Sequence, residues 1–166
     1  MQTGQMRRPV EDANLARTGL PAHLVQGDIE KWQPQAPADA VLLDAPCSAT
    51  GIFRRHPDVL YRIGPRQIAE LADLQARLLD RAADWVKPDG LLLYATCSLE
   101  RAEGEDRIAD FLARHPDFAR MPVSADELCA GFTPNAQGDV RILPGPLAQQ
   151  GGADGFFIAR LRKLTI

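Results

Sequence analysis

Two cysteines, Cys47 and Cys97, each follow a short apolar segment of the sequence. A cysteine sulfur becomes a nucleophile when it loses its proton, which requires a partly exposed setting beside suitable polar or charged groups. Asp44 and Ser98 supply polar neighbours, whereas Cys129 has no such company and is expected to be structural. A lone cysteine at a strand end is more often a small buried apolar residue. The chemical interpretation therefore depends on the two thiols acting together.

The segments before these cysteines are expected to be parallel strands. Residues 40–43 and 91–95 are continuous apolar runs, of the kind that is buried on both faces of a parallel sheet. Between them, apolar residues three or four apart predict one face of a helix, and these are Ile68, Leu71, Leu74, Leu78, Ala82 and Trp85. Such a helix is the crossover that makes two strands parallel. Because ligands bind beyond the carboxyl ends of the strands in such sheets, the two thiols are expected to converge there.

The rest of the chain is expected to extend an α/β sheet. We predict helices over 10–17 and 103–114, and strands over 23–26, 140–143 and 155–161. Gly19 and Pro21 form a stop signal after the first helix, and residues 87–90 (KPDG) end the long helix. Residues 47–64 are expected to be irregular, and most of 119–150 is punctuated by proline and glycine.

The composition is that of a soluble globular protein with reduced thiols. The 166 residues suit one domain, with 45% hydrophobic and 25% charged residues and a net charge of −3. This charge neither indicates nor excludes a nucleic-acid binder, because local basic patches matter more than the total. The sequence contains no apolar run of membrane-spanning length and no secretory signal. Three cysteines without a CxxC pair, beside three histidines, argue against a zinc site or a disulfide framework and favour a cytoplasmic location.

Three motifs give the sequence a resemblance to a known family. Residues 44–51 (DAPCSATG) and 54–58 (RRHPD) resemble the fourth motif of the Sun-type RNA (cytosine carbon-5) methyltransferases, and residues 94–98 (YATCS) are similar to their sixth motif. Residues 154–157 (DGFF) resemble the C-terminal strand motif, with 143–145 (LPG) upstream as in the bacterial ribosomal RNA members. The resemblance covers about residues 10–162. It implies a Rossmann-like, S-adenosylmethionine-dependent methyltransferase fold.

The resemblance also implies a role for each polar residue at the strand ends. Cys97 carries over as the nucleophile that adds to carbon 6 of cytosine, so that carbon 5 can take the methyl group of S-adenosylmethionine. Cys47 carries over as the residue that assists elimination and frees the product. Asp44 would hydrogen-bond the cytosine edge and lie near the methyl donor, and Asp28 resembles the acidic residue at the donor's adenine end. Without the resemblance, both aspartates are better explained as structural residues.

A basic loop follows the first of these motifs. Arg54, Arg55, His56 and Arg62 cluster near the expected site, where exposed arginines can contact phosphates or stack on bases. The plainer interpretation is a solvated loop, but its position next to the thiols favours contact with RNA. A base must leave its stack for a thiol to reach carbon 6, so single-stranded or flipped RNA is the expected substrate. The family resemblance implies that this RNA is ribosomal.

The sequence departs from the family at its N-terminal end. The family's donor site begins with a glycine-rich loop, but the first 27 residues contain only Gly4, Gly19 and Gly27, without a cluster. We therefore expect an N-terminally incomplete fold, with residues 1–166 as the C-terminal portion of a single methyltransferase catalytic domain. The strand over 40–43 would then have an unpaired edge, which invites pairing with another chain. A homodimer that completes the sheet is the alternative to a catalytic fragment.

Two other classes of function compete with this interpretation. A cysteine-dependent phosphatase needs an arginine six positions after its cysteine, but Phe53 and Glu103 stand six positions after Cys47 and Cys97. A cysteine hydrolase needs a histidine placed for it, and no histidine here lies in such a motif. The second rival is an RNA-binding module that lacks a working donor site and has no activity of its own.

Overall fold

The computed structural model describes residues 8–19, 21–145 and 147–165, which divide into two compact units. The first unit, Met1–Gln33, contains helix α1 (Arg8–Thr18). This helix ends as predicted at Gly19, whose φ of 67° is left-handed and whose N–H donates to the Leu15 carbonyl over 2.9 Å. The second unit, Pro34–Ile166, contains the sheet and both active-site cysteine candidates.

The strand predicted over residues 23–26 is wrong. These residues adopt no regular secondary structure, and Val25 is 51% exposed. A strand is stabilised by hydrogen bonds to a neighbouring strand, and none of the described strands pairs with this segment. The apolar residues alone do not supply that partner.

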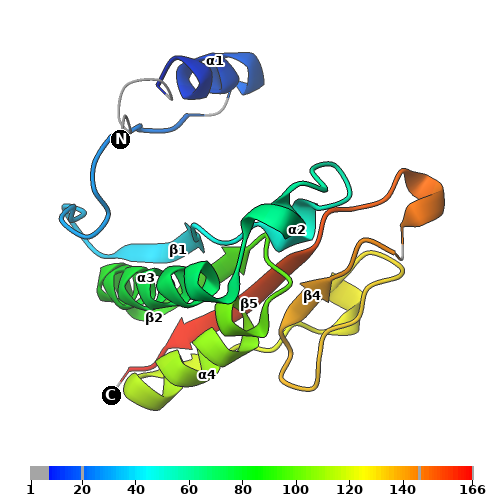
Figure 1. Cartoon of the computed structure of the whole chain (residues 1–166). Coiled ribbons are helices and arrows are strands. Elements are labelled where there is room, and N and C mark those ends of the chain that lie inside the picture. Colours follow the sequence, from blue (N-terminus) through cyan, green and yellow to red (C-terminus); the bar gives the residue numbers. More distant parts are fainter. Residues whose placement is uncertain (1–7, 20, 146, 166) are drawn as a thin grey trace. The chain divides into compact units, whose positions relative to one another are not determined.

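The second unit is built on a mixed five-stranded sheet, with the order β1-β2-β5-β3 and with β4 also paired to β5 (Figure 1). Its strands are β1 (Ala38–Asp44), β2 (Val86–Thr96), β3 (Phe118–Arg120), β4 (Val140–Ile142) and β5 (Phe156–Lys163). The β1–β2 pair is parallel, and every pair that includes β5 is antiparallel. The predicted strands over 40–43, 91–95, 140–143 and 155–161 are thus confirmed, although β3 was not predicted.

Helix α3 (Pro65–Trp85) connects β1 to β2 and forms the predicted parallel crossover. It begins at Gly64, whose N–H donates to the Gln67 side chain over 2.8 Å, with a proline at its first position. The helix ends at Trp85 and β2 begins at once, five residues before the predicted strand start. Residues 87–90 therefore belong to the strand as an irregular stretch, since Ala38 pairs with Val86 but Ala40 pairs with Leu91.

Strand β1 does not have both faces buried as predicted. Leu43 is 5% exposed and packs in the core, whereas its neighbour Leu42 is 67% exposed. The reason is its place in the sheet, because β1 is the end strand and pairs only with β2 among the described residues. One face and the outer edge of β1 consequently lack the cover that a central parallel strand has.

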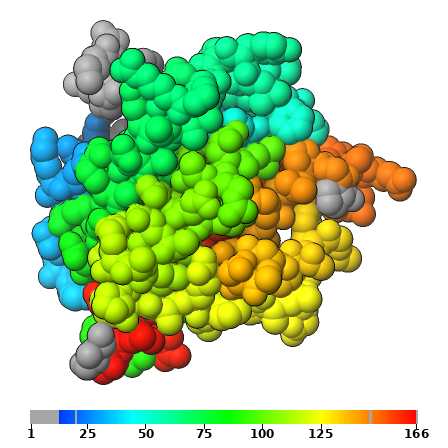
Figure 2. Space-filling view, turned by 60° about the horizontal axis from the view of Figure 1, so that its bottom comes forward, coloured from blue at the N-terminus to red at the C-terminus, as the bar shows by residue number. Residues whose placement is uncertain are grey.

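The hydrophobic core lies between the sheet and helices α3 and α4 (Glu105–Arg114). Figure 2 shows these two helices side by side, in green and yellow-green, on one face of the molecule. Fully buried side chains from α3, β2, α4 and β5 meet there, and these are Leu79, Ala82, Leu92, Tyr94, Ile108, Phe111, Phe157 and Leu161. Helix α4 starts two residues later than predicted, because the 3-10 turn η2 (Arg101–Glu103) precedes it.

The connecting segments contain short helical turns that sequence periodicity did not indicate. These are η1 (Thr50–Ile52), α2 (Val59–Arg62), η3 (Ala125–Glu127) and η4 (Ala148–Gln150). The first two lie within residues 47–64, which were predicted to be irregular throughout. None of the described helices has the length and apolar character required to cross a bilayer.

Candidate active site

The two predicted thiols meet at the carboxyl ends of β1 and β2. The Cys47 and Cys97 sulfurs lie 3.4 Å apart, which confirms that the two segments converge. The parallel pairing brings them together: Asp44 pairs with Ala95, and the Ala45 N–H donates to the Ala95 carbonyl over 2.9 Å. Both cysteines are free and partly exposed, whereas Cys129 is exposed and lies on a different segment.

A close approach of glycine backbone fixes the loop that carries Cys47. The Gly51 N–H donates to the Cys97 carbonyl over 2.9 Å, and the Gly155 N–H donates to the Gly51 carbonyl over 2.8 Å. A Cβ at Gly51 would lie 2.2 Å from the Gly155 oxygen and 2.8 Å from the Cys97 oxygen. Only glycine fits such a contact without displacing the neighbouring backbone. The loops after β1, after β2 and before β5 therefore support one another.

The sulfur–sulfur contact separates the ionisation of the two thiols. A hydrogen bond from Cys47 lowers the pKa of Cys97 to about 7, although burial and the charges of Asp44 and Glu103 oppose ionisation. The same contact, followed by burial, raises the pKa of Cys47. Cys97 is therefore substantially ionised near neutral pH while Cys47 keeps its proton. The contact therefore favours a thiolate at Cys97 and a thiol at Cys47 that can donate to it.

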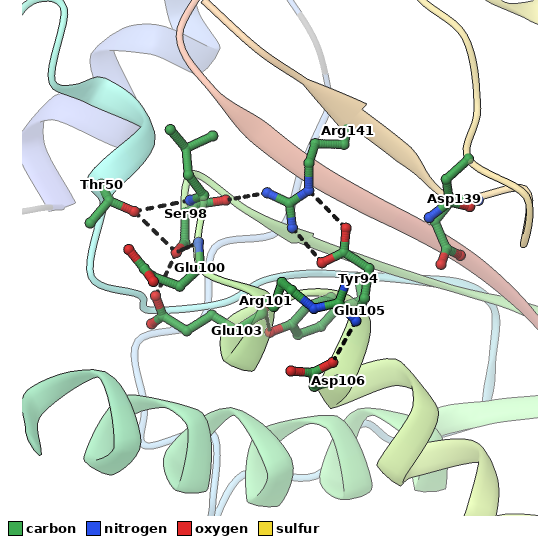
Figure 3. Close-up of polar contacts among 12 residues, drawn as sticks. Thr50, Tyr94, Ser98, Glu100, Arg101, Glu103, Glu105, Asp106, Asp139 and Arg141 are labelled. Carbon is green, nitrogen blue, oxygen red and sulfur yellow. Dashed lines mark hydrogen bonds and ion pairs between the residues drawn. The ribbon is translucent and has the colours of Figure 1, made fainter. Parts of the chain in front are cut away.

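A buried carboxylate, Glu103, lies next to the Ser98 side chain (Figure 3). It accepts hydrogen bonds from the Ser48 N–H over 2.9 Å, from the Ser98 hydroxyl over 2.5 Å and from the Ser48 hydroxyl. Gln75 of α3 donates to Glu103 and to the Pro46 carbonyl, each over 2.9 Å. The sequence placed Glu103 only at the start of a helix. The signal that could have found it is an acidic residue within a segment that otherwise packs against the core.

The two predicted aspartates lie in different units. Asp44 is exposed at the end of β1, accepts no hydrogen bond from the described residues, and is close enough for its charge to raise the pKa of Cys97. Asp28 belongs to the first unit, where the Glu30 N–H donates to it over 3.0 Å and Lys31 pairs with it over 3.2 Å. The backbone hydrogen bond from Glu30 and then Lys31 lower the pKa of Asp28. The structure thus brings Cys47, Cys97 and Asp44 together within the second unit.

The predicted basic residues are all exposed. Arg55 donates through Nε to Asp154 over 2.9 Å, and its hydrogen bonds lower the pKa of that carboxyl. Arg54 and His56 are also near Asp154, since their charges lower its pKa further. Arg62 pairs with Asp58 over 2.5 Å on helix α2. Three of the four basic residues therefore gather around one carboxylate beside the Gly51–Gly155 contact.

A parallel βαβ unit completed by an antiparallel strand, with paired thiols beyond its carboxyl edge, is the arrangement of a Rossmann-like α/β domain with its candidate site at the strand ends. Comparison with known proteins identifies the family. Residues 3–162 match the family described as "16S rRNA methyltransferase RsmB/F", and the chain belongs to it. This confirms the resemblance to the Sun-type methyltransferases.

Individual relatives agree with this assignment. The chain is 46% identical over 153 residues to "Ribosomal RNA small subunit methyltransferase B" of Klebsiella pneumoniae (strain 342), covering 90% of this chain and 32% of that protein. The crystal structure of PH0851 has a TM-score of 0.81 and 34% identity, over 98% of this chain and 36% of that one. NSun6 from Pyrococcus horikoshii, whose structure was determined with SFG, has a TM-score of 0.80 and 28% identity, over 99% of this chain and 41% of that one. The chain spans about a third of the length of the curated relatives that it matches.

Proposed function

We propose that this chain is the C-terminal portion of a catalytic domain that methylates carbon 5 of cytosine in ribosomal RNA. The proposal rests chiefly on the 3.4 Å contact between the Cys47 and Cys97 sulfurs, in which Cys97 is the more readily ionised thiol. The name of the Klebsiella relative supports ribosomal RNA as the substrate. The presence of SFG, an S-adenosylmethionine analogue, in the NSun6 structure supports S-adenosylmethionine as the donor.

In the proposed reaction, the Cys97 thiolate bonds to carbon 6 of the cytosine and the electron pair moves to carbon 5, which becomes enamine-like. Carbon 5 then takes a methyl group, which S-adenosylmethionine supplies as it becomes S-adenosylhomocysteine. A base removes the proton on carbon 5, the bond between carbon 6 and Cys97 breaks, and the electron pair returns to the Cys97 sulfur. The Cys47 thiol assists this release, because its hydrogen bond stabilises the departing thiolate.

Asp44 of the second unit would contact the methyl donor, and Asp28 of the first unit is proposed separately, on the family resemblance alone. Asp44 fits this role because its carboxylate is exposed and accepts no hydrogen bond within the described residues, leaving it able to accept from an amino or hydroxyl group. Asp28 is already paired with Lys31, so a donor hydroxyl would share or replace that contact. The sequence contains no glycine-rich cluster before Asp28. We therefore propose that a further part of the protein, outside these 166 residues, completes the donor site.

The outer edge of β1 supports the same proposal. It has no strand partner among the described residues, and Leu42 beside it is 67% exposed. An apolar edge strand of this kind pairs readily with another strand. That strand comes either from the same protein or from a second copy of the chain. Size-exclusion chromatography with light scattering separates the two, because only the second makes the isolated chain dimeric.

RNA would be bound by the loop that contains Arg54, Arg55, His56 and Arg62. Their exposure supports phosphate contacts, which are weakened by salt. Since Arg55 and Arg62 are already paired, Arg54 is the cation most available to RNA. Arg54→Glu should weaken binding to a ribosomal RNA fragment by about tenfold at low salt. The matched control is Arg66→Glu on α3, whose arginine is exposed and pairs with Glu70, and it should leave binding nearly unchanged.

Covalent trapping tests the reaction. In the full-length protein that contains this chain, with S-adenosylmethionine and RNA that contains 5-fluorocytosine, the fluorine cannot leave as a proton would, so the Cys97 adduct should accumulate and be seen by mass spectrometry. Cys97→Ala should abolish the adduct, and Cys47→Ala should retain it. An adduct that persists in Cys97→Ala but is lost in Cys47→Ala would reverse the two roles.

The alternative is an RNA-binding module without independent activity. The limited coverage of the relatives favours it for the chain in isolation, because most of each relative lies outside the matched region. RNA binding that persists without any adduct, in the presence of the donor, would support this alternative.

A further inference from the structure

Glu103 is a buried acid whose contacts are all with neutral groups. Its side chain is 0% exposed, and no arginine, lysine or histidine among the described residues pairs with it. Four hydrogen bonds instead reach its carboxylate, from Ser48 N–H, Ser48 hydroxyl, Gln75 amide and Ser98 hydroxyl. Placing a carboxylate in the interior costs several kcal/mol even when it is hydrogen-bonded, and an apolar replacement is often as stable. Stability alone does not explain an acid at this position.

The hydrogen-bond donors explain the buried acid better, because the two serines that supply hydroxyl groups adjoin the two cysteines. Ser48 follows Cys47 and Ser98 follows Cys97, and both hydroxyls donate to the same oxygen, Oε2 of Glu103. The two hydroxyl oxygens also lie 3.1 Å apart. One carboxylate oxygen therefore joins the loop after β1 to the loop after β2, through the residues that follow the two cysteines.

The other carboxylate oxygen fixes the loop on the Cys47 side. Oε1 accepts from the Ser48 N–H and from Gln75, which also donates to the Pro46 carbonyl. The peptide groups on both sides of Cys47 are thus held by Gln75 and Glu103. The Tyr94 hydroxyl lies 3.0 Å from Gln75 Oε1 and 2.8 Å from the Glu103 carbonyl oxygen, which locks the arrangement to the sheet. The side chains of Ser48, Gln75, Tyr94, Ser98 and Glu103 are all buried, whereas Pro46 is exposed.

We propose that Glu103 is a positioning residue for the cysteine pair: its carboxylate ties Ser48 to Ser98 and so holds the two sulfurs at hydrogen-bonding distance. The inference deepens the proposed function, on which it rests, because the two thiols must act in turn on one pyrimidine ring. The charge of Glu103 has a second consequence. Together with Asp44 it opposes ionisation of Cys97, and it adds to the sulfur–sulfur hydrogen bond and to burial in raising the pKa of Cys47.

Two substitutions separate the tie from the charge. Glu103→Ala removes every acceptor, so Ser48 and Ser98 lose their shared partner and the two loops are free to separate. Glu103→Gln keeps the side-chain shape: its oxygen still accepts from Ser48 N–H, and its amide donates to the two hydroxyls. Only the negative charge is lost. Glu100→Gln is the matched control, because the Glu100 carboxylate takes part in no hydrogen bond or ion pair among the described residues.

The experiment uses the thiols themselves and needs neither RNA nor methyl donor. In a Cys129→Ala background, dibromobimane cross-links two thiols only when both sulfurs are close. The wild type and Glu103→Gln should cross-link, and Glu103→Ala should lose at least about half of the yield while keeping its circular dichroism spectrum. Iodoacetamide alkylation of Cys97 across pH gives the second measurement. The pH of half-maximal Cys97 alkylation should fall by about half a unit in Glu103→Gln. This shift is smaller than the ~1–3 units that a directly adjacent charge causes. In Glu100→Gln the midpoint should not change.

Each outcome decides the proposal. A folded Glu103→Ala protein that cross-links like the wild type overturns it, because the tie is then unnecessary. If Glu103→Ala does not fold, the double variant Ser48→Ala/Ser98→Ala, which removes both hydroxyls from the same carboxylate oxygen, decides instead, and cross-linking like the wild type in that variant overturns the proposal. Failure of the 5-fluorocytosine adduct with a normal thiol result would count against the proposed reaction alone. If the adduct forms normally while cross-linking and alkylation are unchanged in both Glu103 variants, the positioning role of Glu103 is wrong and the proposed reaction stands.

Discussion

Replacing Cys47 tests directly how the structure activates Cys97. The hydrogen bond from Cys47 is the main cause that brings the pKa of Cys97 from an ordinary value of 9.0 to about 7. The Cys47→Ala substitution removes this donor and leaves burial, Asp44 and Glu103, which favour the neutral thiol, against one backbone hydrogen bond that favours the thiolate. We therefore expect the midpoint of the Cys97 pH–reactivity profile to rise by up to two pH units, to about 9.

The expected rate change at pH 7 follows from two opposing effects. The thiolate fraction of Cys97 falls from about one half to about one in a hundred, which is about fiftyfold. A thiolate of higher pKa is intrinsically more reactive, with a Brønsted slope of ~0.4–0.5, which recovers roughly six- to tenfold over two units. Iodoacetamide alkylation of Cys97 at pH 7 should therefore slow by about five- to eightfold. Above about pH 8.3 the order should invert, and Cys47→Ala should react faster than the wild type.

The assay is alkylation followed by peptide mass spectrometry, which reports Cys97 separately from the other cysteines. Cys47→Ser is the control, because its hydroxyl can still donate to the Cys97 sulfur and should keep the midpoint well below that of Cys47→Ala. A midpoint that stays near 7 in Cys47→Ala would refute the reasoning, since the sulfur–sulfur hydrogen bond would then not be what lowers the pKa of Cys97.

Three further outcomes are expected. Gly51→Ala should destabilise the fold by about 3 kcal/mol in urea unfolding, because its Cβ would lie 2.2 Å from the Gly155 oxygen; an unfolding midpoint equal to the wild type would contradict this. Burial opposes ionisation of Glu105, but hydrogen bonds from Arg141 outweigh it and lower the pKa of Glu105 below 4.5. The pair therefore stabilises the protein above pH 4.5 and less so as the pH falls through the lower folded pKa. Glu105→Gln should cost about 2 kcal/mol at pH 7, and the difference should shrink in acid. Calorimetric titration of the isolated chain with S-adenosylmethionine should give no micromolar binding, and micromolar binding would mean that the donor site is complete.

The sequence was informative wherever local pattern and structure have the same cause. Apolar residues three or four apart predict α3, because one face of that helix packs in the core. The parallel βαβ connection then requires Cys47 and Cys97 to emerge at the same sheet edge, and their sulfurs do meet. The parallel connection alone therefore predicted that these two separate segments lie at one site, without any information on side-chain contacts.

The errors arise where the outcome depends on a partner that the local sequence does not contain. Residues 23–26 have a strand-like composition but no described neighbour to pair with, and Leu42 is exposed because β1 is an end strand. Glu103 was missed for the same reason. Its partners Ser48 and Gln75 are remote in sequence, and only the folded chain brings them to its carboxylate.

The stretch from Asp44 to Glu103 contains both sulfurs, the carboxylate that ties their loops and the helix that joins the strands. The residues of the proposed covalent reaction are thus encoded by one continuous segment. Recombination between relatives at breakpoints outside this stretch would leave the apparatus whole. A breakpoint within α3 would combine the Cys47 loop of one relative with the Glu103 turn of another. These two parts would then have changed independently of each other. Hybrid proteins of this family should therefore tolerate junctions near residue 40 or residue 115 far better than junctions near residue 75.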